Sequence, residues 1–180
     1  MGQQEVRQAI AGAIDFLANN RADAKYTDSP ATARLDDLDA LTVTVDGPSG
    51  AHISTDMPTS VGGTNTTASP GWYLRAAEAS CVATLIAMRA AHLGVKLTNL
   101  EVMVDSESDD WGILGVGDDR GEKVAAGPLT TRVAVKITAA DADASTHSDL
   151  QALVHWAVDH CPVTDAVRRA VPMTIEVDTQ

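Results

Sequence analysis

The sequence predicts an α+β fold in which the strands pair mainly antiparallel. Three features predict this class. A long apolar segment of helical composition, residues 72–93, occupies the middle of the chain. Short segments in which β-branched residues alternate with others precede and follow it. These strand-like segments come in consecutive runs instead of alternating one by one with helices, as they would in a parallel α/β sheet.

The central segment is expected to be a helix because it is rich in Ala, Leu and Met and has no internal Gly or Pro. Ser69 is the expected N-cap and Pro70 the first helical residue, where a missing N–H costs nothing. Gly94 is expected to end the helix in the left-handed conformation. Because the helix is apolar nearly all round, we expect it to be covered on every side.

The remaining elements are justified by their periodicity. An amphipathic helix over residues 3–19 is expected to cover the outside of a sheet or a dimer seam. A second amphipathic helix is expected over residues 148–158, capped by Ser145, Thr146 or Ser148, with a short further turn at 165–169. Strands are expected at residues 32–35, 41–45, 52–55, 97–105, 129–138 and 173–177. Residues 106–128 are expected to form a solvated loop, with Trp111, Ile113 and Leu114 folded inward over a pocket.

Composition excludes several classes of function. The formal net charge of −12 repels phosphate backbones, so we expect no nucleic-acid partner. The glycines spell neither a dinucleotide fingerprint nor a phosphate loop, and the five histidines lack metal-ligand spacing, so no cofactor or metal is expected. No signal peptide and no bilayer-length apolar segment is recognisable, which predicts a cytoplasmic protein without a membrane partner.

The two cysteines are the candidate functional residues of the chain. Cys81 lies in the middle of the central helix, and Cys161 lies eighty positions later in the sequence His-Cys-Pro-Val-Thr-Asp-Ala. Two cysteines are too few for a disulfide scaffold or for a zinc site of their own. From the residues alone they are either inert core thiols or a functional pair.

Together the two cysteine contexts resemble the OsmC/Ohr family. A Ser-Pro pair stands eleven positions before the helix-borne Cys81, and the Cys-Pro-Val turn carries Cys161. The stretches 109–115 and 126–129 also resemble one subgroup of OsmC-like proteins. The resemblance implies an OsmC-like domain over residues 26–180, preceded by an N-terminal helical extension over 1–25. It further implies antiparallel sheets wrapped around long central helices in an intertwined homodimer, with the sites at the interface.

The resemblance also implies an activity, the thiol-dependent reduction of organic (lipid) hydroperoxides in an oxidative stress response. Cys81 is then the thiol that attacks the peroxide and becomes a sulfenic acid, and Cys161 resolves it to a disulfide that an external dithiol reduces. In the family, an arginine and a glutamate activate the first thiol. Arg34 is the expected arginine, with Arg75 as the alternative. Gly71 occupies the glutamate's position, so Glu78, one helical turn before Cys81, is the expected arginine anchor.

A second class of function stays open from the sequence. In that alternative the chain is a non-catalytic OsmC-like dimer that binds a small apolar ligand, and its cysteines do not turn over peroxide. The absence of the family's glutamate favours this reading.

Overall fold

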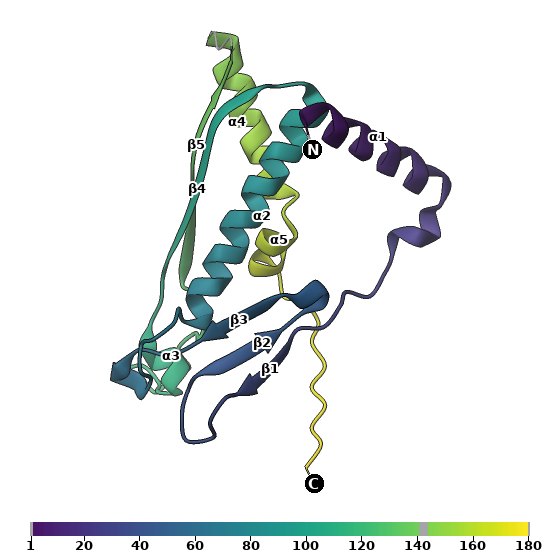
Figure 1. Ribbon diagram of the computed structural model, residues 1–180. Helices are drawn as coiled ribbons and strands as arrows, with labels where there is room; N and C mark the ends of the chain where they lie inside the picture. The colour runs from purple at the N-terminus through teal and green to yellow at the C-terminus, as the bar shows by residue number, and fades with distance from the viewer. Residues whose placement is uncertain (1, 141–143, 180) are drawn as a thin grey trace. The chain divides into compact units, whose positions relative to one another are not determined.

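The computed structural model describes residues 2–140 and 144–179, which form two compact units (Figure 1). Residues 8–76 make one unit, and the residues up to 7 and from 77 onward make the other. Within the described residues no helix combines the length and apolar character needed to cross a membrane.

The elements follow the predicted α+β order. The helices are α1 (Gln3–Asn19), α2 (Pro70–Leu93), α3 (Asp110–Leu114), α4 (Ala144–Asp159) and α5 (Pro162–Arg168). The strands are β1 (Thr32–Leu35), β2 (Val43–Asp46), β3 (His52–Thr55), β4 (Leu97–Glu107) and β5 (Thr130–Ala139). Short 3-10 turns lie at Arg21–Ala24, Pro48–Gly50 and Thr59–Val61. The strands form two sheets, β1-β2-β3 and β4-β5, and all pairing within them is antiparallel, as predicted.

The unit of residues 8–76 contains a three-stranded sheet in the order β1-β2-β3, with Ala33 opposite Val45 and Val45 opposite Ile53. The polar loop that follows β3 is organised by Asp56, which is 1% exposed. Its carboxylate accepts hydrogen bonds from the backbone N–H groups of Met57, Thr64 and Thr66 and from both threonine hydroxyls. These donors lower the pKa of the Asp56 carboxyl well below its ordinary value.

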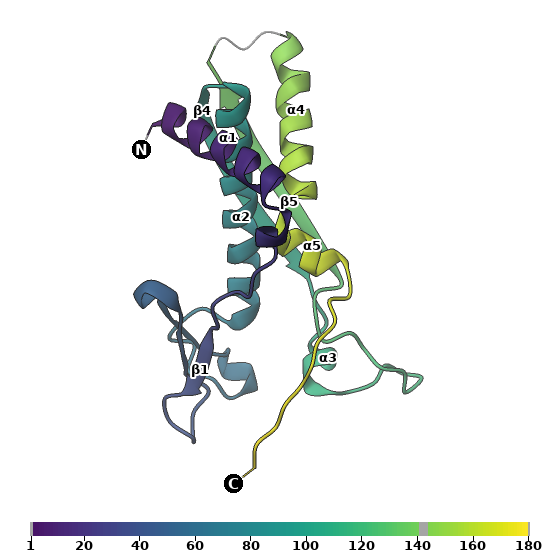
Figure 2. The ribbon, with the colours of Figure 1, turned by 90° about the vertical axis from the view of Figure 1, so that its right-hand side faces the viewer.

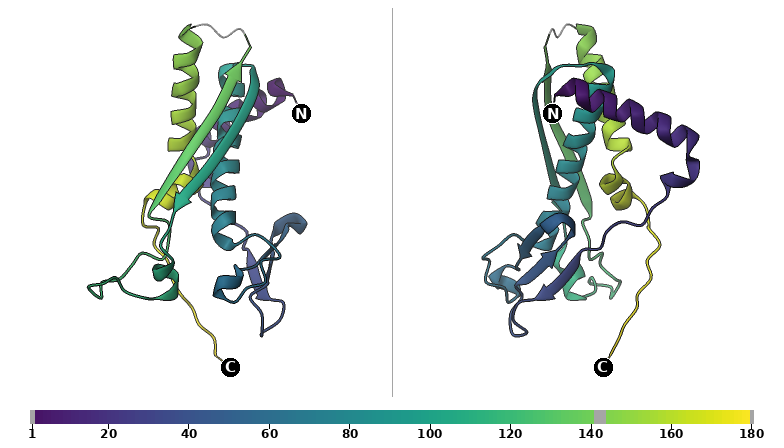
Figure 3. Two further views of the ribbon diagram at one scale, coloured as in Figure 1. Left: turned by 90° about the vertical axis from the view of Figure 1, so that its left-hand side faces the viewer. Right: turned by 45° about the vertical axis from the view of Figure 1, so that its right-hand side comes forward.

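The unit from residue 77 onward contains the long ribbon of β4 and β5, with Val102 opposite Val135 and a bulge between Leu97 and Asn99. Helices α2 and α4 both pack on one face of this ribbon (Figures 1 and 3). The fully buried centre of the core comes from these helices and from the residue that precedes α5: Val82, Ile86, Ala90, Leu153, Ala157 and Cys161. The core is therefore aliphatic, as the low aromatic content of 3% requires.

Helix α2 has the predicted start and end. It begins at Pro70, and the Ser69 hydroxyl accepts the N–H of Trp72 at 3.3 Å. It ends before Gly94, whose φ of 76° is left-handed. The expectation that it is covered on every side is wrong for the single chain. The buried positions 78, 82, 86 and 90 recur every four residues along one face, while Met88 and Leu93 are 38% and 51% exposed.

Four local predictions differ from the structure. The expected solvated loop contains the short helix α3, because the Asp109 carboxylate caps it by accepting the N–H of Trp111. Trp111, Ile113 and Leu114 do not fold inward; they are 45%, 58% and 60% exposed. Helix α4 already includes residues 145–148, so these serines and threonine are not its caps. Helix α5 starts at Pro162, three residues earlier than expected, because Cys161 caps it.

The predicted terminal strand at 173–177 is wrong. After α5 the chain continues as an extended segment without strand pairing (Figure 2). Its alternating apolar side chains Met173, Ile175 and Val177 are 77–83% exposed. Alternation predicts a strand only where a sheet edge accepts it, and this segment pairs with none of the described strands.

Candidate functional site

The fold brings the two cysteines together in one chain. Cys81 lies in the middle of α2, and Cys161 follows α4, immediately before α5. Cys161 is completely buried in the core, and Cys81 packs against the same core while keeping part of its surface exposed. The two thiols lie close enough for each to shift the pKa of the other. Both cysteines are free, and Cys81 is the partly exposed residue of the two.

The end of α4 and the start of α5 position Cys161. Pro162 cannot continue α4, so the chain turns at Cys161 and starts α5 with the proline at its first residue. Cys161 then occupies the N-cap position, where its sulfur accepts the backbone N–H of Thr164 at 3.4 Å. At this position the backbone N–H at the start of the helix donates a hydrogen bond to the sulfur, which favours the thiolate form of Cys161.

The environments of the two thiols differ in their effect on ionisation. Burial opposes ionisation of Cys161, but the side-chain and backbone hydrogen bonds of Thr164, with those of Cys81 and Val163, outweigh it and lower the pKa of this thiol. Burial and the hydrogen bond to Cys161 raise the pKa of the Cys81 thiol. The pair therefore favours a single negative charge on Cys161, with the Cys81 S–H as one of its donors.

Glu78 belongs to the same cluster. It lies one helical turn before Cys81 on α2 and is 2% exposed. Its carboxylate Oε1 accepts the hydroxyl of Thr164 at 3.1 Å, and Thr164 itself is 3% exposed. Thr164 thus contacts both acidic groups, donating its hydroxyl to Glu78 and its N–H to Cys161. Glu78 is placed beside the thiols as expected, but its partner is a threonine from α5.

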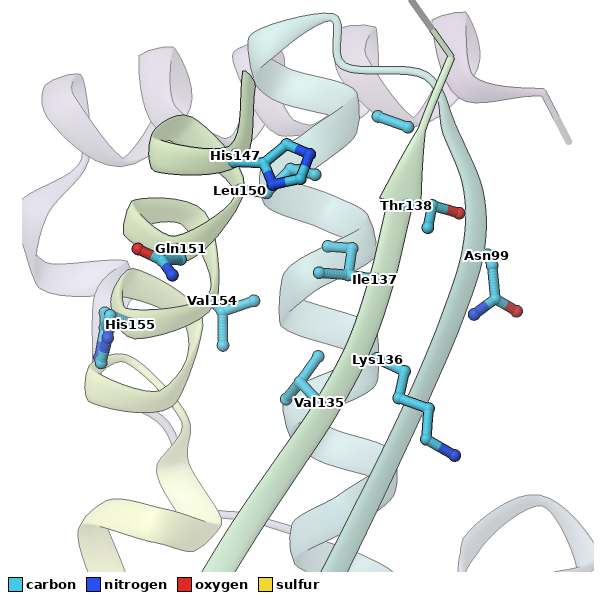
Figure 4. Close-up of a pocket in the computed structure, with 11 residues that line it drawn as sticks. Asn99, Val135, Lys136, Ile137, Thr138, His147, Leu150, Gln151, Val154 and His155 are labelled. Atoms are coloured by element: carbon cyan, nitrogen blue, oxygen red, sulfur yellow. The ribbon is translucent and has the colours of Figure 1, made fainter. Parts of the chain in front are cut away.

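Two cavities lie between α4 and β5. The larger, about 640 Å³, is a groove in which Leu150 and Val154 of α4 face Val135 and Ile137 of β5, with His147 on its rim (Figure 4). A smaller cavity of about 310 Å³ is lined by Glu78, Thr164, His155 and Arg168 together with valines of α4, α5 and β5. Val135, Val154 and His155 line both cavities, and neither cysteine lines either one.

The expected arginine is in the other unit. Arg34 lies in β1, where its Nη1 contacts Asp46 Oδ2 at 2.9 Å in an exposed ion pair. Its function as the activating arginine stays a prediction. In the described part of the chain no group of His, Cys, Asp and Glu residues is arranged to hold a metal ion.

An aromatic stack borders the cysteine turn. Trp156 and His160 stack with ring centroids 4.2 Å apart, and the Arg89 guanidinium lies 4.5 Å from the centre of the Trp156 ring. His160 is exposed and follows the last residue of α4. The stack joins the end of α4 to α2 and so fixes the start of the turn that carries Cys161.

Sequence reasoning missed Thr164. The signal that could have found it is the spacing Cys161-Pro162-x-Thr164, which places a hydroxyl three residues after a residue at the N-cap. The threonine's contact with Glu78 joins residues 86 positions apart, and no local pattern carries that information.

Comparisons with solved structures give the fold. The chain is similar to an OsmC-like protein of unknown function from Vibrio cholerae, with a TM-score of 0.62, 13% identity, and 78% of this chain and 94% of that chain covered. An OsmC-like protein from Mycoplasma pneumoniae gives a TM-score of 0.61 at 14% identity, with 80% and 89% covered. An organic hydroperoxide resistance protein OsmC from Legionella pneumophila gives 0.55 at 19% identity, with 79% and 90% covered.

A search among curated proteins gave no significant match. The family model described as OsmC-like protein matches residues 63–176, a range that contains both cysteines, Glu78 and Thr164. This range lies inside the predicted domain 26–180, whose boundary with the extension 1–25 stays a prediction. With the fold of the solved relatives and this match over more than half of its length, the chain belongs to the OsmC-like protein family.

Proposed function

We propose that the chain is a thiol-dependent peroxidase that reduces organic hydroperoxides with Cys81 and Cys161. The observation that carries the proposal is that Cys81 and Cys161, far apart in sequence, meet in one core, where Cys81 is partly exposed and Cys161 is buried. A solved relative that is described as an organic hydroperoxide resistance protein supports it.

The exposure of the sulfurs assigns their order of reaction. A peroxide can reach Cys81, whereas Cys161 is completely buried. In the first step the Cys81 thiol gives its proton to the Cys161 thiolate, and the Cys81 sulfur attacks the terminal oxygen of the hydroperoxide. The O–O bond breaks, the alkoxide takes a proton from solvent, and Cys81 becomes a sulfenic acid.

In the second step the two cysteines form a disulfide. Cys161 attacks the sulfenic sulfur, the S–O bond breaks, water leaves, and a disulfide joins the two residues. An external dithiol then reduces the disulfide by thiol–disulfide exchange and returns both thiols. A dithiol reductant agrees with the predicted cytoplasmic location, which stays a prediction.

Turnover of peroxide tests the proposal. Purified protein with cumene hydroperoxide and dithiothreitol is expected to consume peroxide, and Cys81→Ser is expected to abolish consumption. Cys161→Ser is expected to form the sulfenic acid more slowly, because the thiolate that takes the Cys81 proton is gone. The sulfenic acid is then expected to accumulate, trapped on Cys81 by a cyclic 1,3-dione, because no resolving thiol remains. Equal, slow consumption by the wild type and Cys81→Ser would contradict the proposal.

We further infer that the chain forms a homodimer through α2. In the single chain only one face of this apolar helix is buried, and Met88 and Leu93 are left exposed beside Ala87. A second copy of the chain can cover such a face with the same residues. The mass in solution, measured by light scattering, checks this inference.

The groove between α4 and β5 supports the second candidate function, binding of a small apolar ligand. Its volume of about 640 Å³ lies within the range of ligand pockets, and apolar side chains from both elements line it. If the wild type does not turn over peroxide, an apolar fluorescent probe that Val154→Trp displaces from the groove would support this candidate instead.

A further inference from the structure

Glu78 is a buried carboxyl in the core of the unit that contains the thiols. It is 2% exposed, and its carboxylate accepts a hydrogen bond from the Thr164 hydroxyl. Removing a carboxylate from water costs several kcal/mol unless charge partners offset it. No ion pair to Glu78 is found among the described residues of its unit. A carboxyl at this depth therefore points to proton chemistry.

Thr164 connects this carboxyl to the buried sulfur. Its hydroxyl donates to Glu78 Oε1 at 3.1 Å, and the same side chain interacts with the Cys161 sulfur. The backbone N–H of Thr164 also donates to that sulfur, at 3.4 Å. Because these two contacts hold the threonine between Cys161 and Glu78, and because a hydroxyl can accept one proton while it donates another, Thr164 can relay a proton from the sulfur to the carboxylate.

A proton transfer from Cys161 to Glu78 avoids the cost of creating a new buried charge. Ionising a buried thiol with release of the proton to solvent creates a new charge in a low-dielectric interior. Moving the proton from Cys161 to the Glu78 carboxylate transfers a negative charge from oxygen to sulfur and leaves the net charge of the core unchanged. The desolvation cost of a new charge is then avoided.

We propose that Glu78, acting through the Thr164 hydroxyl, is the base that ionises Cys161 and the source of the proton for the hydroxide that Cys81 loses when the disulfide forms. The starting state is a Cys81 sulfenic acid, a Cys161 thiol and an ionised Glu78. The Cys161 proton moves to Thr164 Oγ1 while the hydroxyl proton of Thr164 moves to Glu78. The Cys161 thiolate attacks the Cys81 sulfur, and the S–S bond forms as the S–O bond breaks.

The leaving hydroxide takes the stored proton and departs as water, which regenerates the Glu78 carboxylate. Cys161 is oxidised and the sulfenic sulfur of Cys81 is reduced, so no further oxidant or reductant is needed. Glu78 acts through another residue and is therefore a positioning residue for the proton. This inference rests on the proposed two-cysteine function and deepens its second step.

The smaller cavity lies against the buried carboxyl. Glu78 and Thr164 line this space of about 310 Å³, which is large enough for several water molecules. His155 of α4 and Arg168 of α5 are the other titratable side chains among its lining residues, and the Asp159 carboxylate holds Arg168 at 3.0 Å. The thiols of Cys81 and Cys161 are the remaining ionisable groups of the cluster.

A single-turnover experiment tests the inference. Reduced protein receives one equivalent of cumene hydroperoxide, and mass spectrometry follows the sulfenic acid, trapped with a cyclic 1,3-dione, and the disulfide. Glu78→Gln is expected to slow closure of the disulfide roughly a hundredfold, the size of a lost acid–base group, and to prolong the sulfenic acid.

A matched pair keeps the test independent of folding. Thr164→Val is expected to slow closure as Glu78→Gln does, whereas Thr164→Ser keeps a hydroxyl and is expected to restore it. Thr131→Val, the same change on the wall of the same cavity, is expected to form the disulfide at the wild-type rate. Closure at the wild-type rate in Glu78→Gln, or equal closure in Thr164→Val and Thr164→Ser, would overturn the inference.

A second oxidant separates this inference from the proposed function. Diamide forms an adduct with Cys81 that the Cys161 thiolate displaces, so disulfide formation by diamide needs the same ionisation of Cys161 without a peroxide. If Cys161→Ser forms no sulfenic acid with peroxide, the proposed function fails. The diamide reaction still decides the case for Glu78, because slow closure in Glu78→Gln supports the base and unchanged closure overturns it.

Discussion

The backbone N–H of Thr164 points to the sulfur of Cys161 at 3.4 Å, so the first turn of α5 is capped by a thiol. This relationship makes Cys161 a structural residue as well as the resolving thiol of the proposed function. The same sulfur holds the start of a helix and receives the hydrogen bonds that favour its ionised form. The predictions below separate these two functions and test the elements around them.

The two thiols are expected to titrate as a coupled pair, with the first proton lost below the ordinary thiol pKa and the second above it. Cys81→Ala removes one hydrogen-bond donor to Cys161, so the remaining thiol is expected to have a higher pKa than the first step of the wild type. Cys161→Ala removes the interaction that raises the pKa of Cys81, so that pKa is expected to fall. Thiolate absorbance at 240 nm against pH measures both shifts. Opposite shifts would show that the thiols do not interact in this way.

Replacement of Cys161 is expected to reveal its capping function. Serine is a favoured N-cap and keeps an acceptor for the N–H of Thr164, whereas alanine leaves that donor without its cap. Cys161→Ala is therefore expected to unfold with about 1 kcal/mol less free energy than Cys161→Ser. Urea unfolding of both reduced proteins measures the difference, and equal midpoints would contradict the capping function.

Asp56 is expected to make the stability of its unit depend on pH under acidic conditions. Because its folded pKa is lowered, its contribution is fully present above its unfolded pKa of about 4 and is lost as the pH falls from there toward the folded pKa. Asp56→Asn is expected to be less stable at pH 7, because the amide replaces one acceptor oxygen with a donor. Its stability is also expected to fall less between pH 5 and pH 2. A steeper acid loss in the variant, measured by urea unfolding, would contradict this.

Gly63 is expected to tolerate no side chain. A Cβ at this position would lie 1.8 Å from the carbonyl oxygen of Met57, a contact that requires the backbone to move. Gly63→Ala is therefore expected to lower the melting temperature. Gly12→Ala is the matched control, because nothing lies within 4 Å of its Cβ and alanine favours a helix by about 1 kcal/mol over glycine. The control is expected to raise the melting temperature or leave it unchanged.

Met88 tests the proposed dimer. Its side chain is 38% exposed on α2, so a glutamate there meets water in the single chain but a second apolar helix in the dimer. Met88→Glu is expected to shift the protein toward monomer at micromolar concentration in sedimentation. The control Glu101→Gln, on the exposed side of β4, is expected to leave the distribution unchanged. Identical distributions for the wild type and Met88→Glu would place the interface elsewhere.

Local chemistry allowed much of the fold to be predicted. The span of α2 follows from a helix-forming composition between Pro70 and Gly94, and the alternation at residues 41–45 and 52–55 predicts the strands β2 and β3. These features depend on residues a few positions apart, where propensity and capping decide. The terminal strand at 173–177 was predicted on the same grounds and is wrong, because a strand needs a neighbour that alternation cannot supply.

The candidate site, like the fold, could be predicted from the sequence only in part. The sequence by itself determined the family, since the contexts of Cys81 and Cys161 were sufficient to indicate it, and it singled out these two cysteines as the candidate site. Only the tertiary structure decided that Cys161 is the buried sulfur and that Thr164 joins it to Glu78. The physical reason is that ionisation depends on burial and on donors from α2 and α5, which are far apart along the chain and meet only when the core packs.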